Sequence, residues 1–416
     1  NLTGLPALPA SSLDGKKQTL AMNYTLTSKA IPMLPLTLRF NSYDYNNNTP
    51  EITFPQVVIN DSSVTALTDP HTSEPFGYDR KNLELNASWH FLEDSSLKFL
   101  YNWERFNREH REVEQSTEHT VGTSLDVNPY QWLLLRGSYR HGSRDPEEYV
   151  GSSAMLPSLR KYDEAGRTRH RAEALLQITP LEQVSFGASY GTTQDDYEEK
   201  GCVWLGFDQC YGLLKDISNN YTFELTYDPT AQLSLFAEYT REKYNYRQRS
   251  RQRNPASATA PANDSPNNDW ETTRRDHVDN YAVGLSASPS SRVVVDLFYS
   301  LSVAINKLTT RALGDPAIAG YLVTTAPPYP GVSDYPDTSN RWHQMVSSVK
   351  FPLLSGNLTP KLEYRYEKYD RIDFQLASVG QYFTDSQLAS SLFLGVGADV
   401  PGYVAHIVAA SLEYRF

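Results

Sequence analysis

The residues that could perform chemistry are few and scattered in this chain. Its nine histidines form no HExxH motif and stand in no Ser/His/Asp arrangement, so no zinc or nucleophilic hydrolase is indicated. His90, His119 and His406 fall within strand-like segments, where a histidine of a wall or lumen is a simpler interpretation than a haem ligand. No CxxCH or paired CxxC motif occurs. We therefore expect a protein that is not an enzyme and that carries no cofactor of its own.

Two oxygen-rich segments and one cysteine pair are the remaining candidate sites. "DYNNNTP" (44–50) and "NDSPNND" (263–269) contain the oxygen ligands that Ca²⁺ prefers, although solvated turns account for them more simply. Cys202 and Cys210 bracket "VWLGFDQ" and could form a local disulfide or remain free thiols. An oxidising cell envelope would favour the disulfide.

Composition excludes several classes of protein. The 416 residues carry a net charge of −11, which argues against a nucleic-acid partner. Mean hydropathy is −0.52, and no apolar run reaches the roughly 18 residues that a membrane helix needs. The opening "NLTGLPALPASSLDGKK" lacks the apolar core of a signal peptide. Length alone would suggest two or three soluble domains, but the repeated pattern described next indicates one different architecture.

Alternating apolar and polar residues recur in at least a dozen segments. In "SRVVVDLFYSLSVAIN" (291–306), every second residue from Val293 to Ile305 is apolar, and the other face is largely polar. This period of two is typical of a strand with one wet face. The segment is long, since strands of globular proteins usually have about three to ten residues. Tilted strands that cross a membrane need about 9–11 residues plus any projecting part.

Short and long connections alternate along the chain. The short, turn-like set is 28–34, 92–95, 128–131, 179–182, 228–231, 288–291 and 352–357. The long, polar set is 46–78, 145–166, 198–215, 249–270, 307–338 and 371–401, with 109–113 as a short exception. Tight periplasmic turns and long extracellular loops are typical of outer-membrane barrels. The sequence therefore predicts an all-β fold, a large antiparallel transmembrane β-barrel that forms one domain over residues 1–416.

The C-terminal strand and the strand count refine this prediction. The chain ends "YVAHIVAASLEYRF", and Leu412, Tyr414 and Phe416 on one face resemble the signal for barrel insertion. We count about fifteen strands, whereas bacterial single-chain barrels have even numbers. We therefore expect further strands and a signal peptide upstream. A soluble β-sandwich is the alternative, but its strands would be shorter and its loops less unequal in length.

Charges of both signs occupy the positions predicted to face the lumen. These positions are Arg39, Glu84, Glu104, Arg136, Arg140, Arg171, Glu173, Glu224, Glu238, Arg292, Asp296, Glu363 and Arg365. A selective ion pore would show one dominant sign. The mixture suits either a wide aqueous channel or a lumen packed against a polar protein plug.

Three stretches resemble the MtrB/PioB family of decahaem-associated outer-membrane proteins. They are "SSLDGKKQTLAMNYTLTSKAIPMLPLTLRFNSYDYNNNTP" (11–50), "YDRKNLELNASWHF" (78–91) and "SLKFLYNWERFNREHREVEQSTEHTVG" (96–122). Further matching units, such as "LLLRGSYRHGSRDPEEY" (133–149), extend the similarity to Phe416. The resemblance covers essentially the whole chain. Family members are barrels of more than twenty strands, which agrees with the expected upstream part.

The resemblance implies an integral protein of the Gram-negative outer membrane that acts as an insulating sheath. Such a barrel would enclose a periplasmic multihaem c-type cytochrome and let it meet an extracellular multihaem cytochrome. Haem c would be carried by these partners, and the barrel itself would transfer no electron. A soluble cytochrome cannot cross hydrocarbon with its polar surface bare. The alternative is a general or substrate-specific diffusion porin.

Overall fold

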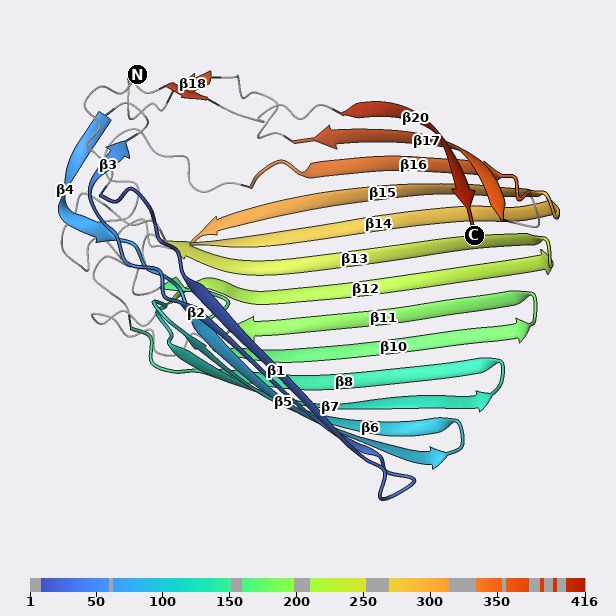
Figure 1. The fold of residues 1–416 in the computed structure, drawn as a ribbon, viewed down its shortest axis with the longest axis horizontal. Helices are drawn as coiled ribbons and strands as arrows, with labels where there is room; N and C mark the ends of the chain where they lie inside the picture. The colour runs from blue at the N-terminus through green and yellow to red at the C-terminus, as the bar shows by residue number, and fades with distance from the viewer. Residues whose placement is uncertain are drawn as a thin grey trace.

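The chain folds into a curved antiparallel sheet (Figure 1). The structure is a computed structural model and describes residues 9–59, 63–150, 159–197, 210–251, 269–313, 334–353, 357–373, 382–384, 392–394 and 402–415. No helix among these residues is long and apolar enough to span a membrane. The all-β prediction is confirmed.

One sheet contains almost every strand. Its first half comprises β1 (Lys17–Ser28), β2 (Leu36–Asn47), β5 (Tyr78–Leu92), β6 (Ser95–Arg108), β7 (Gln115–Tyr130), β8 (Leu133–Pro146), β10 (Arg167–Leu181) and β11 (Val184–Tyr197). Its second half comprises β12 (Tyr211–Thr230), β13 (Leu233–Arg251), β14 (Asp269–Ser290), β15 (Val293–Ala312), β16 (Thr338–Lys350), β17 (Leu358–Ile372) and β20 (Tyr403–Tyr414). Consecutive members of this series pair with each other, so the path has the predicted fifteen strands. Among the described residues the sheet is not closed, since there β1 pairs only with β2 and β20 only with β17.

Five short strands lie outside this path. β9 (Leu159–Arg160) pairs in parallel with the start of β12. β3 (Thr53–Ile59) and β4 (Ser63–Thr72) form a separate hairpin, as do β18 (Tyr382–Thr384) and β19 (Leu392–Leu394). Gly212 is required where β9 pairs, because its φ is +139° and a Cβ would lie 2.2 Å from the carbonyl oxygen of Arg160.

Short turns and long connections lie at opposite ends of the sheet (Figure 1). The strands run further toward the long connections than the sequence indicates. β13 continues to Arg251, β14 begins at Asp269 and β15 continues to Ala312, so parts of the predicted loops 249–270 and 307–338 are strand. Because the alternating pattern fades into polar residues there, the hydropathy pattern alone ends each strand too early.

Proline occupies a bulge and not the tip of the turn. Pro129, Pro180, Pro229 and Pro289 each lie where the strand register shifts, and a two-residue turn follows. Proline has no N–H to donate to a ladder and is therefore tolerated at such irregularities. The turns at 128–131, 179–182, 228–231 and 288–291 are confirmed, and each proline lies at the bulge that precedes the turn tip.

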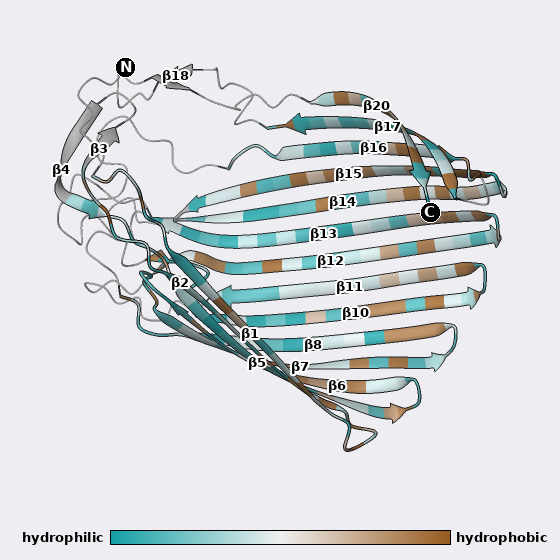
Figure 2. Ribbon diagram, in the orientation of Figure 1, coloured by the Kyte–Doolittle hydropathy of each residue, from teal (hydrophilic) through white to brown (hydrophobic). Residues whose placement is uncertain are grey.

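The two faces of the sheet differ in polarity. Leu85, Phe99, Leu125, Leu135 and Leu297 are among many large apolar side chains that are exposed, and the register places them all on one face. We call this the outer face and the opposite one the lumen face. The strands are most apolar toward the turn end and most polar toward the long connections (Figure 2). An outer-membrane barrel presents such an apolar band to lipid.

A row of six tyrosines crosses the outer face at constant height. Each is the seventh residue of a strand that leaves a short turn: Tyr101, Tyr139, Tyr190, Tyr239, Tyr299 and Tyr364. Each hydroxyl is hydrogen-bonded to a side chain of the next strand: His119 (2.9 Å), His170 (2.7 Å), Asn219 (3.0 Å), Asp279 (2.7 Å), His343 (2.9 Å) and His406 (2.8 Å). We call these six pairs the tyrosine belt. His119 and His406 therefore belong to the outer wall.

The tyrosine belt marks where the outer face changes character. Next to the belt on the long-connection side, β13 carries Arg241 and Lys243, and β11 carries Thr192 and Gln194 on this face. On β15 the apolar run continues to Ile305 before Lys307. Tyrosine favours a membrane interface because its ring is apolar and its hydroxyl is polar. The membrane boundary toward the long connections therefore lies next to the tyrosine belt on β11 and β13 and further along the strand on β15.

Candidate partner-binding surface on the lumen face

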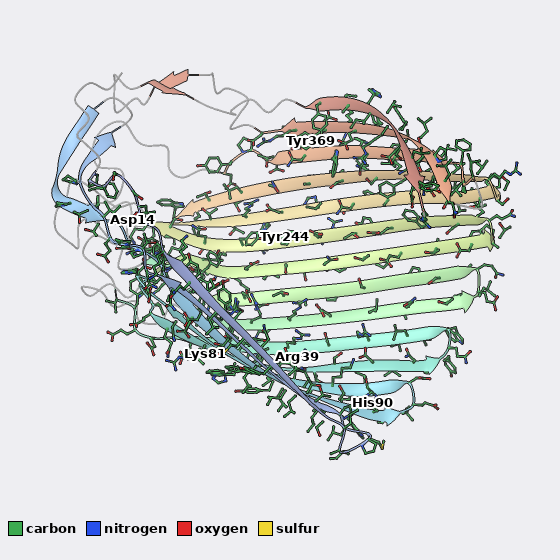
Figure 3. The ribbon with its side chains drawn as sticks, viewed as in Figure 1. Asp14, Arg39, Lys81, His90, Tyr244 and Tyr369 are labelled. Atoms are coloured by element: carbon green, nitrogen blue, oxygen red, sulfur yellow. The ribbon has the colours of Figure 1, made fainter. Side chains whose placement is uncertain are left out.

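The predicted lumen positions share the polar face, with one exception. Arg39 on β2 lies directly opposite Glu84 on β5, whereas Lys81 on β5 belongs to the outer face; Figure 3 labels Arg39 and Lys81. The register places the other strand positions on the lumen face in the same way. Arg292 is the exception, because it lies in the two-residue turn between β14 and β15 and not on the wall. β15 begins at Val293, directly after Arg292, so the predicted alternation starts one residue too early.

Most lumen charges are neutralised by a neighbour on the wall. Arg39 pairs with Glu84 at 3.0 Å, and Glu104 pairs with Arg80 at 2.5 Å. Further lumen pairs are Arg136–Asp126, Arg171–Glu173, Asp296–Lys350, Glu363–Lys361 and Glu363–Arg365. Their side chains are mostly part-exposed, so each pair contributes about 0–1 kcal/mol. The mixture of signs on this face is therefore largely a mosaic of local pairs.

Several carboxylates on the lumen face lack such a neighbour, and two of them face each other. Glu224 on β12 and Glu238 on β13 are directly opposite each other in the ladder. Both residues are exposed, and no ion pair within 4.0 Å involves either one in the part of the chain that the structure describes. Like charges directly opposite in a sheet destabilise it. A cationic group that approached from the lumen would relieve this repulsion.

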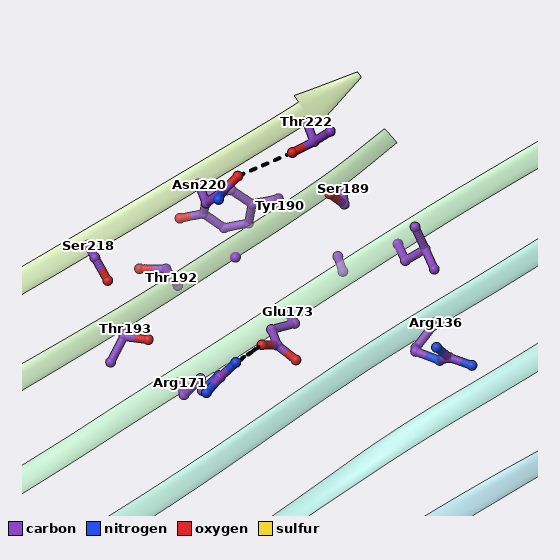
Figure 4. Close-up of a pocket in the computed structure, with 13 residues that line it drawn as sticks. Arg136, Arg171, Glu173, Ser189, Tyr190, Thr192, Thr193, Ser218, Asn220 and Thr222 are labelled. Carbon is purple, nitrogen blue, oxygen red and sulfur yellow. Dashed lines mark hydrogen bonds and ion pairs between the residues drawn. The ribbon is translucent and has the colours of Figure 1, made fainter. Parts of the chain in front are cut away.

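A shallow hollow of about 450 Å³ lies beside these strands (Figure 4). Arg171 and Glu173 of β10 form one side of the hollow and are hydrogen-bonded to each other, and Arg136 of β8 lies beyond them. Apart from Leu175, its remaining lumen-face lining is small and polar: Ser189, Gly191, Thr193, Ser218, Asn220 and Thr222. Short side chains allow a partner to approach the wall closely here.

An apolar row interrupts the polar lumen face. Phe236, Gly284, Phe298 and Val346 lie directly opposite one another on β13, β14, β15 and β16. The two phenyl rings stack with centroids 6.1 Å apart. They pass over Gly284, where a Cβ would lie 2.0 Å from the Phe236 ring. The sequence shows Phe298 only as an exception to the alternation, because the register is needed to bring the row together.

Part of one long connection folds against the lumen face. The segment Leu159–Gly166, which we call the folded-in loop, is held by the guanidinium of Arg144 on β8. That group donates hydrogen bonds to the carbonyl oxygens of Tyr162 (2.5 Å), Asp163 (3.2 Å) and Ala165 (2.9 Å). Arg108 on β6 donates another to the Asp163 carbonyl oxygen at 3.0 Å. These arginines fix the loop at the long-connection end of the wall.

Two buried carboxylates tie the folded-in loop to the connection 109–114. Glu164 is 1% exposed and pairs with Arg111, whereas Glu112 is 2% exposed and pairs with Lys161. Burial raises the pKa of Glu164 although Arg111 opposes this shift. The pKa of Glu112 is lowered; burial opposes this shift, and the hydrogen bond from Lys161 is the largest cause that favours it. The pKa values of the two carboxyls are thus shifted in opposite directions.

The remaining predicted sites fall partly outside the described residues. Cys210 is disulfide-bonded and 1% exposed, and Cys202 lies outside the described part of the chain, as do 263–268 and Phe416. Asp44–Asn47 continue β2, and the Thr49 hydroxyl donates to Asn47 at 2.7 Å. No cluster of three or more His, Cys, Asp or Glu suited to a metal occurs among the described residues. The Ca²⁺ hypothesis stays a prediction.

Comparison with known proteins decides the family. The sequence profile described as an outer membrane beta-barrel porin, MtrB/PioB, matches residues 1–416. The chain belongs to the MtrB/PioB family. It is thus an integral protein of the outer membrane. The resemblance noted in the sequence is confirmed.

Among MtrB/PioB relatives, the chain is similar to the outer membrane protein MtrB of Shewanella baltica (strain OS185). The two are 30% identical over 243 residues, which cover 56% of this chain and 32% of the relative. The chain thus matches about a third of the length of that relative.

Solved structures similar to the chain include two transporters. One is the outer membrane transporter YddB from Escherichia coli (10% identity; 85% of this chain and 55% of that one; TM-score 0.38). The copper transporter OprC has 8% identity over 98% of this chain and 73% of its own, with a TM-score of 0.38. Likeness at this level carries no argument about function.

Proposed function

We propose that this chain forms part of the wall of an outer-membrane sheath. The sheath would enclose a periplasmic multihaem c-type cytochrome and allow contact with an extracellular multihaem cytochrome, so that electrons cross the membrane. Family membership and the relative named MtrB support an outer-membrane barrel of this type. The polar lumen face supports a protein occupant. A cytochrome with a polar surface cannot stand bare in hydrocarbon, and a wall that is apolar outside and polar inside would shield it from lipid.

The strongest support for a bound partner is the pair of opposed carboxylates Glu224 and Glu238. A lumen filled by water needs no special charge arrangement, and most charges of this wall are already paired locally. The opposed carboxylates beside the small-residue hollow and the apolar row offer one wall patch with charge, room and apolar surface. Interfaces combine such features to fix the orientation of a partner.

In this proposal the barrel has no catalytic task. It keeps lipid away from the cytochrome, holds it in register and shapes the exit toward the extracellular partner. The haem would belong to the cytochromes, and the chain would supply no haem ligand. The short turns would face the periplasm and the long connections the exterior, in agreement with general barrel construction.

The test is retention of haem by the purified barrel. We would replace Glu224→Lys and Glu238→Lys together and measure the Soret absorbance of c-type haem per barrel. The matched control is the swap Arg39→Glu with Glu84→Arg, which keeps a local pair at another lumen position. We expect the first variant to lose haem at normal barrel levels and the swap to retain it. Equal haem content in both variants and the wild type would contradict the gripped partner.

A diffusion porin is the second candidate, and the folded-in loop favours it. A loop held against the lumen face narrows a channel, and Arg144 and Arg108 fix it there. A colourless purified protein that conducts ions in a planar bilayer would support the porin. A coloured complex with little conductance would support the sheath.

A further inference from the structure

A group of basic side chains lies on the outer face beyond the tyrosine belt. Lys243 and Arg247 on β13, Arg275 on β14 and Lys307 on β15 form this group, which we call the basic patch. All four residues are exposed. Arg275 lies directly opposite Lys307, and opposite Asn245 on its other side, so Lys243 and Arg247 are its diagonal neighbours. Diagonal neighbours on one sheet face are about 7–8 Å apart, so the four side chains can contact one ligand surface.

The basic patch is poorly neutralised by the protein. The acidic residues on the outer face of these three strands are Asp269, Glu271 and Asp279, which pair with Arg251 at 2.6 Å, Arg311 at 3.8 Å and Arg241 at 3.7 Å. Lys307 pairs with Asp337 at 3.2 Å, and both side chains remain more than half exposed. Within the described residues, the other three members of the patch form no ion pair. A chain with net charge −11 thus concentrates positive charge at this place.

The position of the basic patch relative to the membrane limits what can bind it. Lys243 is four residues beyond Tyr239, and Lys307 is eight residues beyond Tyr299. At about 3.3 Å per residue and a strand tilt of about 40°, these offsets correspond to roughly 10–20 Å above the belt. The patch lies on the same face as the lipid-contacting band and is continuous with it. On β15 the apolar run ends at Ile305, directly before Lys307 on this face, so the patch borders the lipid-contacting band and does not face the lumen.

We propose that the basic patch binds the phosphate groups of lipid headgroups in the leaflet next to the long connections. Guanidinium groups bind phosphate in a bidentate manner, and ammonium groups add point charges. Long basic side chains bend toward an interface while their stems cover apolar surface, which suits Lys243 and Lys307 above the band. This inference is independent of the enclosed cytochrome and depends only on the membrane boundary set by the tyrosine belt.

The experiment uses the purified protein in nanodiscs of phosphatidylcholine that contain either diphosphoryl lipid A or its dephosphorylated form. After extraction in mild detergent, mass spectrometry counts the lipid A that stays bound. The test variant is Lys243→Gln, Arg247→Gln, Arg275→Gln and Lys307→Gln. A charge-matched control replaces the lumen cations Arg39, Arg136, Arg140 and Arg171 by Gln. A second variant exchanges Lys and Arg within the patch and keeps its charge. Heat-modifiable gel migration reports folding.

We expect the wild type, the lumen control and the charge-keeping variant to retain diphosphoryl lipid A. The neutralised variant should retain at least about tenfold less diphosphoryl lipid A, since each Lys or Arg near an anionic lipid surface strengthens binding to it. If the folded neutralised variant retained as much diphosphoryl lipid A as the wild type, the proposal would be overturned. Retention of dephosphorylated lipid A would also overturn it. Stabilisation of the wild type by inorganic phosphate alone, without lipid retention, would overturn the lipid assignment.

Discussion

The hydroxyl of Tyr139 on β8 lies 2.7 Å from Nδ1 of His170 on β10, two residues beyond the residue directly opposite. The same offset joins Tyr101 to His119 and Tyr364 to His406. The partner is always on the long-connection side, so each hydroxyl points away from the apolar band. This repeated geometry fixes one membrane boundary on the wall.

Cysteine labelling along β8 should locate that boundary. Gly137 and Ser143 lie on the outer face on either side of Tyr139, and a Cβ at Gly137 meets nothing within 4 Å. In membranes, a water-soluble maleimide should label Ser143→Cys and leave Gly137→Cys unlabelled, because only the former lies beyond the belt. Labelling of both in detergent is the control. Equal labelling of the two in membranes would show that the boundary is misplaced.

Arginine at a lipid-facing position of β15 should damage assembly. Leu297 is 43% exposed on the outer face, whereas Ser300 lies on the lumen face opposite Ala282 and Gln344. An arginine on the lipid face costs about 2–4 kcal/mol at the middle of the bilayer and less toward an interface, and Leu297 lies two residues from Tyr299 on the apolar side of the belt. Leu297→Arg should therefore lower the yield of folded barrel far more than Ser300→Arg does, as measured by heat-modifiable migration. Similar yields would refute the register.

Removing the Arg144 side chain should release the folded-in loop. Arg144→Ala deletes three hydrogen bonds to loop carbonyls, and leaving buried polar groups unpaired costs about 1–3 kcal/mol. Amide exchange of Tyr162–Gly166 should accelerate while the rest of the sheet stays protected. Arg140→Ala, on the same face of the same strand, is the matched control and should leave the loop protected. Unchanged exchange in Arg144→Ala would mean that other contacts hold the loop.

The buried carboxyl of Glu164 should make loop protection depend on pH. Burial raises its pKa, so its favourable contribution is complete below the ordinary value of 4.5 and is lost as pH rises through the raised pKa. Wild-type protection factors of 159–166 should therefore decline over that window, and Glu164→Gln should flatten the decline. Glu112→Gln should not flatten it, because the lowered pKa of Glu112 acts at more acidic pH. A decline of equal slope in Glu164→Gln would exclude this carboxyl as its source.

Strand pattern and topology could be predicted because a period of two and alternating turn lengths are local properties of the sequence. The position of Pro289 could not, since proline marks turns and bulges equally well. Pairs such as Tyr299 with His343 depend on the register between strands, which the sequence indicates only after pairing is known. Contacts such as Arg111 with Glu164 join segments far apart in sequence, and no local signal announces them.

One feature of the bulges bears on the size of the barrel. The residue before proline donates its N–H to a turn carbonyl of the preceding hairpin: Thr179 to Trp132, Asp228 to Gln183 and Ser288 to Gln232. At these three places one hairpin therefore meets its neighbour through the same joint at the turn end of the sheet. Gene duplication or loss of one such unit would change the circumference of the wall and leave its height unaltered. Barrels that repeat this joint can therefore evolve a wider or narrower lumen, for enclosed proteins of different diameter, within a bilayer of fixed thickness.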